Sequence, residues 1–297
     1  MSRAKLRGLL ACALMALATT SAWTKESPAY VVIKPVANLY RGPREDADVV
    51  SQALLGARLL ELERSGAWVR IKGEDDYPGW IQISSLRALE TGEHYPASLE
   101  PGKALEVDSL SANLYVEPDV TKHAPVMTAP FGARLERVDG GKDTERWLEI
   151  RLPDHRIAWI QRGDARTDLK PLGIEASLEL AKRFLGVTYT WGGSSSFGFD
   201  CSGFTQTIMR RRGVIMPRDA NIQAAWSGLV PVADRSRLKP GDLLFFGKDS
   251  ASITHTGIYL GKGAFIHDTT KDHPRTQISD LSDPYWSKLL VAMRRLK

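Results

Sequence analysis

Cys201 is the residue of this sequence with the clearest potential for chemistry. It follows Asp200 and begins a segment that is predicted to be a helix up to Arg212, where Gly213 acts as a stop. Asp200 is a favourable N-cap residue, so Cys201 falls in the first turn of that helix. The partial positive charge of a helix N-terminus favours a thiolate, the form that a cysteine nucleophile requires. Considered alone, a cysteine here could equally be a small buried apolar residue.

Two histidines could supply the base that a thiol nucleophile needs. Thr254–Leu260 and Ala264–Asp268 are predicted strands that a tight Gly-Lys-Gly turn separates. In such a hairpin His255 and His267 lie opposite each other to within about one or two residues of register. We therefore expect His255 to act as general base toward Cys201 and His267 to orient its imidazole. A shared metal is the other use of two histidines, but no Asp or Glu with ligand spacing lies beside them, so we expect neither a metal nor another cofactor.

The first residues have the features of a secretory signal peptide. Basic residues precede an apolar stretch, Leu9–Ala18, and a small-residue cleavage site that ends at Ala22. The stretch is too short to span a membrane, so we expect export to the periplasm or the medium. Lipid anchoring through Cys12, which lies in a lipobox-like sequence, is a less favoured alternative. If residues 1–22 are removed, the mature chain keeps only Cys201. An unpaired cysteine in an exported protein points to a reactive role.

Composition excludes several classes of protein. The chain has 297 residues, of which 43% are hydrophobic and 25% charged, which excludes collagen-like, mostly disordered and polytopic membrane proteins. Removing residues 1–22 takes away three positive charges and no negative one, so the formal net charge falls from +5 to +2. The run Arg210-Arg211-Arg212 is expected to be the solvated end of a helix. A nucleic-acid partner and a transmembrane anchor are therefore disfavoured.

An internal repeat organises the first half of the chain. The tetrapeptide at 37–40 recurs 75 residues later at 112–115, and three further matches follow in the same order at spacings of 76 to 79. Each copy is predicted to contain several short strands joined by turns, a pattern typical of a small barrel. The repeated tryptophans are expected in the barrel cores rather than on a ligand-binding surface. We expect the copies at residues 29–90 and 104–168 and a further domain at 172–297.

Three motifs in the C-terminal part resemble the NlpC-type family of cell-wall cysteine peptidases. They are Asp200–Phe204 (DCSGF), Leu238–Phe246 (LKPGDLLFF) and His255–Gly261 (HTGIYLG). The resemblance implies a papain-like α+β domain, in which the cysteine lies on a helix packed against an antiparallel sheet. The repeat resembles bacterial SH3 domains in its NLYR, WVRI and GWI segments. The expected fold class is therefore multidomain, with two small all-β SH3-like barrels before the peptidase domain.

The resemblance also assigns roles to single residues. It implies that Cys201 is the nucleophile, His255 the general base and His267 the third member of a triad. Tyr189 matches the family tyrosine that lies beside the nucleophile near the oxyanion site.

Substrate recognition is implied in the same way. In similar proteins with SH3 domains, an acidic residue before the cysteine and a serine after it hold a free N-terminal L-alanine. Asp200 and Ser202 match these positions. An aromatic residue of the first SH3 domain closes the pocket in such proteins, and Tyr77 is the candidate here. Arg218 could bind a carboxylate or could equally be a surface arginine at a turn.

The implied activity is hydrolysis of peptidoglycan stem peptides. The expected bond joins γ-D-glutamate to meso-diaminopimelate, in fragments that carry a free N-terminal L-alanine. Peptidoglycan or a muropeptide is then the partner, and the protein is expected to be a monomer. Two alternatives stay open, namely a cysteine-dependent muramoyl-L-alanine amidase and a non-enzymatic wall-binding SH3 protein.

Overall fold

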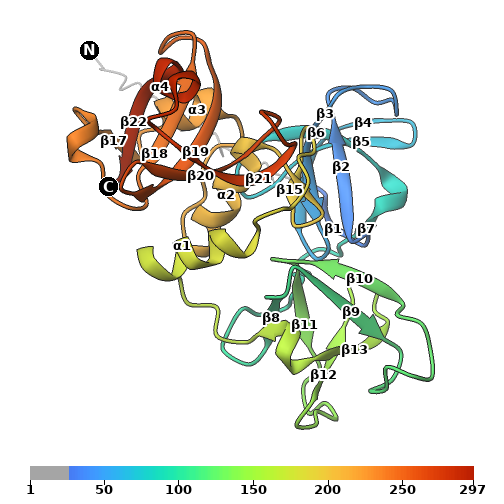
Figure 1. Ribbon diagram of the computed structural model, residues 1–297. Helices are drawn as coiled ribbons and strands as arrows, with labels where there is room; N and C mark the ends of the chain where they lie inside the picture. Colours follow the sequence, from blue (N-terminus) through green and yellow to red (C-terminus); the bar gives the residue numbers. More distant parts are fainter. Residues whose placement is uncertain (1–26) are drawn as a thin grey trace, which may run out of the picture.

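The computed structural model describes residues 27–297, which form three regions (Figure 1). Two all-β modules come first, and a region of helices and strands, the C-terminal region, begins at residue 174. The expected signal peptide at residues 1–22, with Cys12, lies outside the described residues. Within the described part of the chain, no helix combines the length and the apolar character needed to cross a membrane.

Module 1, residues 29–88, is a seven-stranded antiparallel sheet with the strand order β3-β2-β6-β5-β4-β1-β7. Its elements are β1 (Ala29–Val32), β2 (Val36–Tyr40), β3 (Val49–Leu54), β4 (Arg58–Ser65), β5 (Trp68–Lys72), β6 (Pro78–Gln82), the 3₁₀ helix η1 (Ile83–Ser85) and β7 (Leu86–Ala88). Buried and half-buried side chains alternate along β5, as they do in a strand with one face toward a core. Val69, Ile71 and Ile81 point inward and form part of that core.

Module 2, residues 104–166, repeats the arrangement strand for strand. Its elements are β8 (Ala104–Val107), β9 (Ser111–Tyr115), β10 (Met127–Pro130), β11 (Arg134–Arg137), β12 (Trp147–Arg151), β13 (Ile157–Gln161), the 3₁₀ helix η2 (Arg162–Asp164) and β14 (Ala165–Arg166). The order β10-β9-β13-β12-β11-β8-β14 is that of module 1 with each strand replaced by its counterpart. Trp147 and Trp159 are buried together with Tyr115, which confirms the expected core position for these two tryptophans. Their counterparts in module 1, Trp68 and Trp80, are only half-buried and lie outside its core cluster, so the expectation is wrong there.

The modules differ in how closely their strands approach at one position of the repeat. A β carbon added to Gly79 on β6 would lie 2.7 Å from Cβ of Leu39 on β2, closer than such atoms approach in proteins. The matching residue of module 2 is Ala158 on β13, and its methyl group is fully buried. Module 2 therefore has space for a methyl group where module 1 has none.

The C-terminal region is built on a six-stranded antiparallel sheet with the order β17-β22-β18-β19-β20-β21. The strands are β17 (Leu229–Pro231), β18 (Leu243–Gly247), β19 (Ile253–Gly261), β20 (Ala264–Thr269), β21 (Arg275–Asp280) and β22 (Leu290–Leu296). The remaining elements are α1 (Ile174–Arg183), the short strands β15 (Ser194–Ser195) and β16 (Gly198–Phe199), α2 (Cys201–Arg211), α3 (Ala220–Ala225), the 3₁₀ helix η3 (Arg235–Arg237) and α4 (Pro284–Leu289). The predicted helix at Cys201 and the hairpin of β19 and β20 are both confirmed.

Helix α2 is fixed against one face of this sheet. Its Phe204 and Ile208 share a buried cluster with Phe245, Ile258 and Ile266 from the three central strands. The opposite face is covered by α4, whose Trp286 packs edge-on against Phe246 at a ring-centroid distance of 5.2 Å. Close packing on both faces leaves α2 and the β19–β20 hairpin in a fixed mutual position.

The three regions meet around the C-terminal end of α2. Arg211 is only 5% exposed and donates to Glu106 (2.9 Å) and Asp108 (3.2 Å) of module 2. Arg210 pairs with Glu74 of module 1 at 3.1 Å. The expectation that this arginine run is a solvated helix end is therefore wrong for Arg211, because module 2 supplies carboxylates that helical spacing cannot reveal.

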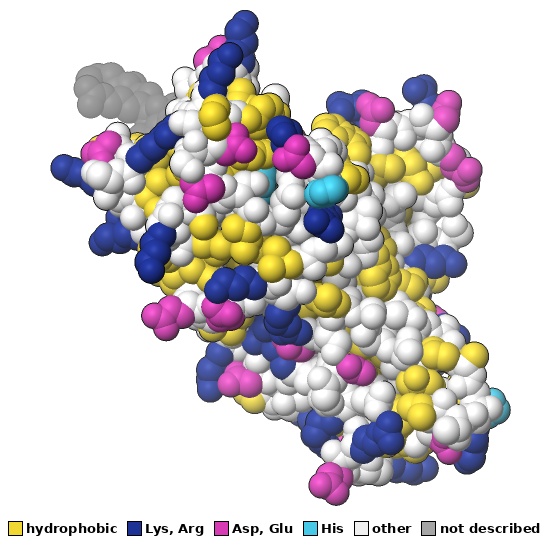
Figure 2. Space-filling model, in the orientation of Figure 1, with side chains coloured by type: hydrophobic (Ala, Val, Ile, Leu, Met, Phe, Trp, Pro, Cys, Tyr) yellow, Lys and Arg dark blue, Asp and Glu magenta, His cyan; other side chains and the backbone are white. Residues whose placement is uncertain are grey.

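Basic and acidic side chains are interspersed over all three regions on the face drawn in Figure 2. This mixture agrees with the small formal net charge of +5. Mixed surface charge gives little long-range attraction for a polyanion.

Candidate active site

Cys201 opens helix α2 directly after strand β16. Asp200 is the N-cap, and its Oδ1 accepts the backbone N–H of Gly203 at 2.7 Å, which confirms the predicted capping. The side chain of Cys201 is buried, with 7% of the residue exposed. N–H groups in the first turn of a helix lack partners within the helix, and the N–H of Cys201 is one of them.

The thiol of Cys201 is held in its neutral form. Burial raises the pKa of Cys201 to about 12, and the negative charge of Asp200 adds to the rise. The backbone N–H groups of Thr256 and Ser202 and the charge of Arg218 lower this pKa, but less strongly. Burial therefore outweighs the helix N-terminus, and the pKa of this thiol lies above its ordinary value rather than below it.

His255 and His267 lie in direct contact across the β19–β20 hairpin. Nε2 of His255 and Nδ1 of His267 are 2.7 Å apart, and Nε2 of His267 lies 3.0 Å from Oγ of Ser279 on β21. Gly257 leaves room for this arrangement, because a β carbon there would lie 3.0 Å from Cβ of His267. The ring of His255 also stacks on Trp286, at a centroid distance of 5.2 Å and an angle of 30°.

Both imidazoles are neutral. Burial lowers the pKa of His255 to about 3, although the charge of Asp200 opposes part of this shift. Burial, and the neighbouring His255, also lower the pKa of His267. Each ring therefore carries one proton, and one proton is shared in the hydrogen bond between them.

Thr256 connects Cys201 with the strand that carries His255. The backbone N–H of Thr256, the residue that follows His255 in β19, donates toward the Cys201 sulfur. The packing of α2 on the sheet through Phe204 and Ile258 holds this approach in place. The structure thus places Cys201 against the strand that carries His255, and His255 against His267.

Tyr189 lies beside this group in the loop before β15. Its backbone N–H donates to Pro274 at 2.9 Å, which ties the loop to the segment before β21. Burial raises the pKa of the half-buried Tyr189 phenol, and the neighbouring Cys201 and Asp200 raise it further. The phenol therefore stays protonated and can donate a hydrogen bond.

Arg218 is neither a surface arginine nor free to bind the carboxylate of a ligand. It is 1% exposed, so it is not a surface arginine, and the carboxylate that it binds is Asp200. The two side chains pair through Nη1–Oδ1 (3.0 Å) and Nη2–Oδ2 (2.7 Å). Arg218 also donates to Oγ of Ser202 at 2.9 Å and to Oγ of Ser51 in module 1 at 3.0 Å.

Asp200 has few acceptor positions left for a ligand. Besides Arg218, its Oδ1 accepts from Gly203 and Ser202, and its Oδ2 accepts from the N–H of Gly192 at 3.1 Å. A carboxylate has about four lone-pair positions, and these five contacts use them. Asp200 and Ser202 thus form a closed network with Arg218.

Tyr77 contacts a carboxylate that sequence reasoning missed. Its hydroxyl donates to Oδ1 of Asp219 at 3.3 Å, across the boundary between module 1 and the C-terminal region. Asp219 holds the N-cap position of α3, yet its side chain makes no capping hydrogen bond. Burial and the charge of Asp219 raise the pKa of Tyr77 to about 12, so the phenol is a donor. In the sequence, the only sign of Asp219 is its position directly after Arg218. That position by itself indicates no more than the start of a helix.

Comparison with known proteins agrees with this arrangement. Residues 186–295 match the NlpC/P60 family, and residues 39–86, within module 1, match the bacterial dipeptidyl-peptidase Sh3 domain. A γ-D-glutamyl-L-lysine dipeptidyl-peptidase of Bacillus cereus is 30% identical over 265 residues, which cover 82% of this chain and 74% of the relative. A protein of the same name from Bacillus subtilis is 29% identical over 274 residues, which cover 84% and 82%.

The fold is similar to a solved structure as well. A crystal structure of an NlpC/P60 family protein from Bacillus cereus superposes with a TM-score of 0.75 at 24% identity, and the match covers 90% of this chain and 99% of the other. The chain belongs to the NlpC/P60 family. Module 1 is its SH3-like part, and the candidate site lies in the family domain.

Proposed function

We propose that this protein is a cysteine peptidase that hydrolyses the γ-D-glutamyl–diamino acid bond of peptidoglycan stem peptides. The observation that carries the proposal is the meeting of the Cys201 sulfur with the backbone next to His255, whose ring is hydrogen-bonded to His267 at 2.7 Å. A nucleophile, a base and a residue that orients the base are the parts that acyl transfer through a thioester requires.

In the proposed mechanism the proton leaves the thiol as the bond forms. His255 accepts the proton of Cys201 while the sulfur attacks the γ-carbonyl carbon. The imidazolium then returns that proton to the departing amine of the diamino acid, which leaves a thioester on Cys201. Water activated by His255 hydrolyses the thioester and restores the thiol. Because the Cys201 pKa is about 12 and the His255 pKa about 3, proton transfer accompanies attack rather than preceding it.

His267 determines which nitrogen of His255 can act as base. When Nε2–H of His255 donates to Nδ1 of His267, and Nε2–H of His267 donates to Ser279, the Nδ1 of His255 is left as an acceptor. The same hydrogen bond stabilises the imidazolium during turnover. The N–H of Cys201 at the helix start and the hydroxyl of Tyr189 are the proposed donors to the oxyanion.

The proposed binding site for a free L-alanine amine lies between module 1 and the C-terminal region. Tyr77 and Asp219 offer a hydroxyl and a half-exposed carboxylate there. Asp200 and Ser202, whose hydrogen bonds are made largely within the protein, would support this site indirectly through their contacts with Arg218. An ammonium group requires an anionic partner, and a charged hydrogen bond discriminates between substrates more strongly than apolar contact. Two relatives are named dipeptidyl-peptidases, which supports release of a dipeptide.

The proposal also covers the domains and the location. The shared strand order supports a second SH3-like domain in module 2, and α2 packed on an antiparallel sheet supports a papain-like layout. A peptidoglycan substrate implies a periplasmic or secreted protein, as the basic and apolar segments of residues 1–22 also indicate.

The test is hydrolysis of defined peptides. Wild-type protein and the Cys201→Ala variant are incubated with L-Ala-γ-D-Glu-meso-diaminopimelate and with the corresponding L-lysine peptide, and the products are read by mass spectrometry. We expect the wild type alone to release L-Ala-γ-D-Glu, and the preferred peptide identifies the diamino acid. His255→Ala should be equally inactive, whereas His123→Ala, an exposed histidine of module 2, should keep full activity.

Two outcomes would contradict the proposal. Hydrolysis by Cys201→Ala would exclude the cysteine as nucleophile. If the wild type leaves both peptides intact but releases whole stem peptides from a muramoyl-peptide substrate, the protein is an amidase instead.

A further inference from the structure

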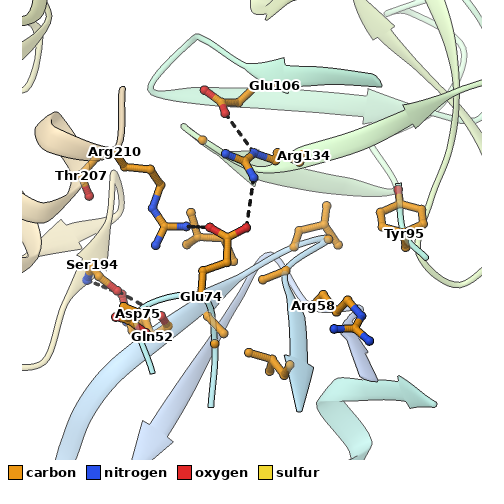
Figure 3. Close-up of a pocket in the computed structure, with 18 of the residues that line it drawn as sticks. Gln52, Arg58, Glu74, Asp75, Tyr95, Glu106, Arg134, Ser194, Thr207 and Arg210 are labelled. Carbon is orange, nitrogen blue, oxygen red and sulfur yellow. Dashed lines mark hydrogen bonds and ion pairs between the residues drawn. The ribbon is translucent and has the colours of Figure 1, made fainter. Parts of the chain in front are cut away.

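A cavity adjoins the candidate active site where module 1 meets the C-terminal region. Its volume is about 500 Å³, and module 1, module 2, the segment between them and helix α2 all contribute to its walls (Figure 3). Cys201, His255 and His267 do not line it, but Tyr77 and Ser51 do, so the cavity borders the proposed amine site. Ligand pockets have volumes of about 300–1,000 Å³ and occur preferentially at domain interfaces. The cavity is therefore of a size to hold a small molecule.

One part of the wall is apolar and incompletely covered. Leu54 of β3, and Pro96 and Leu99 of the segment between the modules, line it. Leu99 is 53% exposed, which is high for a large aliphatic side chain beside a cavity. A ligand with an apolar portion would gain free energy by covering these side chains, at roughly 25 cal/mol per Å² of apolar area.

Two of the three acidic residues of the cavity, Glu74 and Glu106, already have basic partners, and the third, Asp75, accepts from the amide of Gln206 at 2.9 Å. Glu74 lies between Arg134 and Arg210, at 3.3 and 3.1 Å, and Figure 3 shows it reaching both. Glu106 pairs with Arg134 at 3.3 Å and with Arg211 at 2.9 Å. These pairs involve all three regions of the molecule, so the cavity exists only while the regions are docked.

Arg58 is the exception among the charged residues of the wall. It lies at the start of β4, it is exposed, and within residues 27–297 it forms no ion pair and no side-chain hydrogen bond. In Figure 3 it lies on the side of the cavity away from Arg210. Four arginines and three acidic residues line the cavity, so the wall carries one net positive charge, and Arg58 is the cation without a partner.

We propose that this cavity binds a small monocarboxylate with an apolar portion, of up to about dipeptide size. The planar guanidinium of Arg58 accepts a carboxylate through two parallel hydrogen bonds, and Leu54 and Leu99 cover the apolar portion. A dianion such as inorganic phosphate fits less well, because Glu74 and Glu106 lie in the same wall. A ligand that binds only the docked arrangement also stabilises it.

The test uses the full mature chain and N-acetyl-L-leucine as probe, with its neutral amide as control ligand. Binding is measured by calorimetry and by the shift of the thermal midpoint. We expect the acid to bind and to raise the midpoint, and both the amide and the Arg58→Gln variant to bind at least about tenfold more weakly, equivalent to about 1.4 kcal/mol. Arg44→Gln, which alters a solvent-exposed arginine of the same module, should bind the acid like the wild type. Leu99→Ser should also weaken binding.

Several results would overturn the proposal. One is absence of binding of the acid at concentrations up to about 10 mM, above the millimolar affinity of a weak small ligand. Equal affinity of Arg58→Gln and wild type is another. NMR shifts on acid binding that appear at Tyr189 and Cys201 rather than at Leu99 would mean that the probe occupies the active site. Peptide hydrolysis by Arg58→Gln is measured separately, so failure of this site is distinguishable from failure of the proposed peptidase activity.

Discussion

Modules 1 and 2 have the same strand order but contact the C-terminal region through different chemistry. Module 1 places Ser51 and Tyr77 against Arg218 and Asp219, beside the candidate active site. Module 2 places Glu106 and Asp108 against the opposite end of α2. The comparison indicates that the side chains at the interface, rather than the fold of a module, decide whether it contacts the candidate active site or the far end of α2.

The largest effect should come from the link between module 1 and the active site. Arg218→Met leaves Asp200 buried without its partner, and breaking a buried pair costs roughly 3–5 kcal/mol. We expect a large fall in the thermal midpoint and a loss of kcat/KM on the order of 10²-fold, because the start of α2 shifts. Arg218→Lys keeps the positive charge but loses the two parallel hydrogen bonds of the guanidinium group. It should therefore keep part of the stability that Arg218→Met loses, and a smaller part of the activity. Unchanged activity of Arg218→Met would show that the link between module 1 and the active site does not contribute to catalysis.

The corresponding change at module 2 should affect stability alone. Arg211→Met removes the partner of Glu106 and Asp108, although Arg134 and Arg166 still face Glu106. The loss should therefore fall below the roughly 3–5 kcal/mol of a fully broken buried pair, measured by denaturant unfolding. We expect kcat/KM of the remaining folded protein to stay near the wild-type value. A loss as large as that of Arg218→Met would remove the contrast between the modules.

The backbones of the modules can be compared at one matched position. Gly79→Ala places a methyl group against Leu39 and should destabilise module 1 by about 1–3 kcal/mol, as overpacking does. Ala158→Gly removes a methyl group from module 2 and should cost roughly 0.5–1 kcal/mol. The free energies of unfolding of the two variants, measured under identical conditions, give the difference between these two losses of stability. Equal losses would mean that the two modules are equally closely packed here.

The smallest effect concerns recognition alone. Tyr77→Phe removes one hydrogen bond to Asp219, worth about 1 kcal/mol, so kcat/KM for a peptide with a free L-alanine amine should fall roughly fivefold. The same peptide with an acetylated amine should show no change between the two proteins. Arg156→Gln, in the matching turn of module 2, is the control and should leave both rates unaltered. An equal fall for both peptides would show that Tyr77 does not sense the amine.

Local sequence patterns predicted much of the site because they describe single elements. The Asp200 cap placed Cys201 at a helix start, and the glycine turn brought His255 and His267 together in one hairpin. The repeat likewise indicated two similar β modules, and their strand orders are the same.

The remaining features depend on contacts between distant parts of the chain. Ser51 and Arg218 are 167 residues apart, so no spacing rule could pair them. Asp219 has the sequence pattern of a helix cap and becomes a partner of Tyr77 only when module 1 docks. The pKa of Cys201 depends on how many atoms surround the sulfur, and burial of that kind is a property of the whole fold.

The buried, protonated thiol has a consequence for chemical durability. Peroxides and alkylating reagents attack thiolates far faster than thiols, and they need access to the sulfur. Cys201 is 7% exposed and its pKa is raised to about 12, so between turnovers it offers such reagents neither the reactive form nor an open path. If Cys201 is the nucleophile, as proposed, this resting state protects it in oxidising surroundings, where an exposed thiolate would be lost to sulfenic acid.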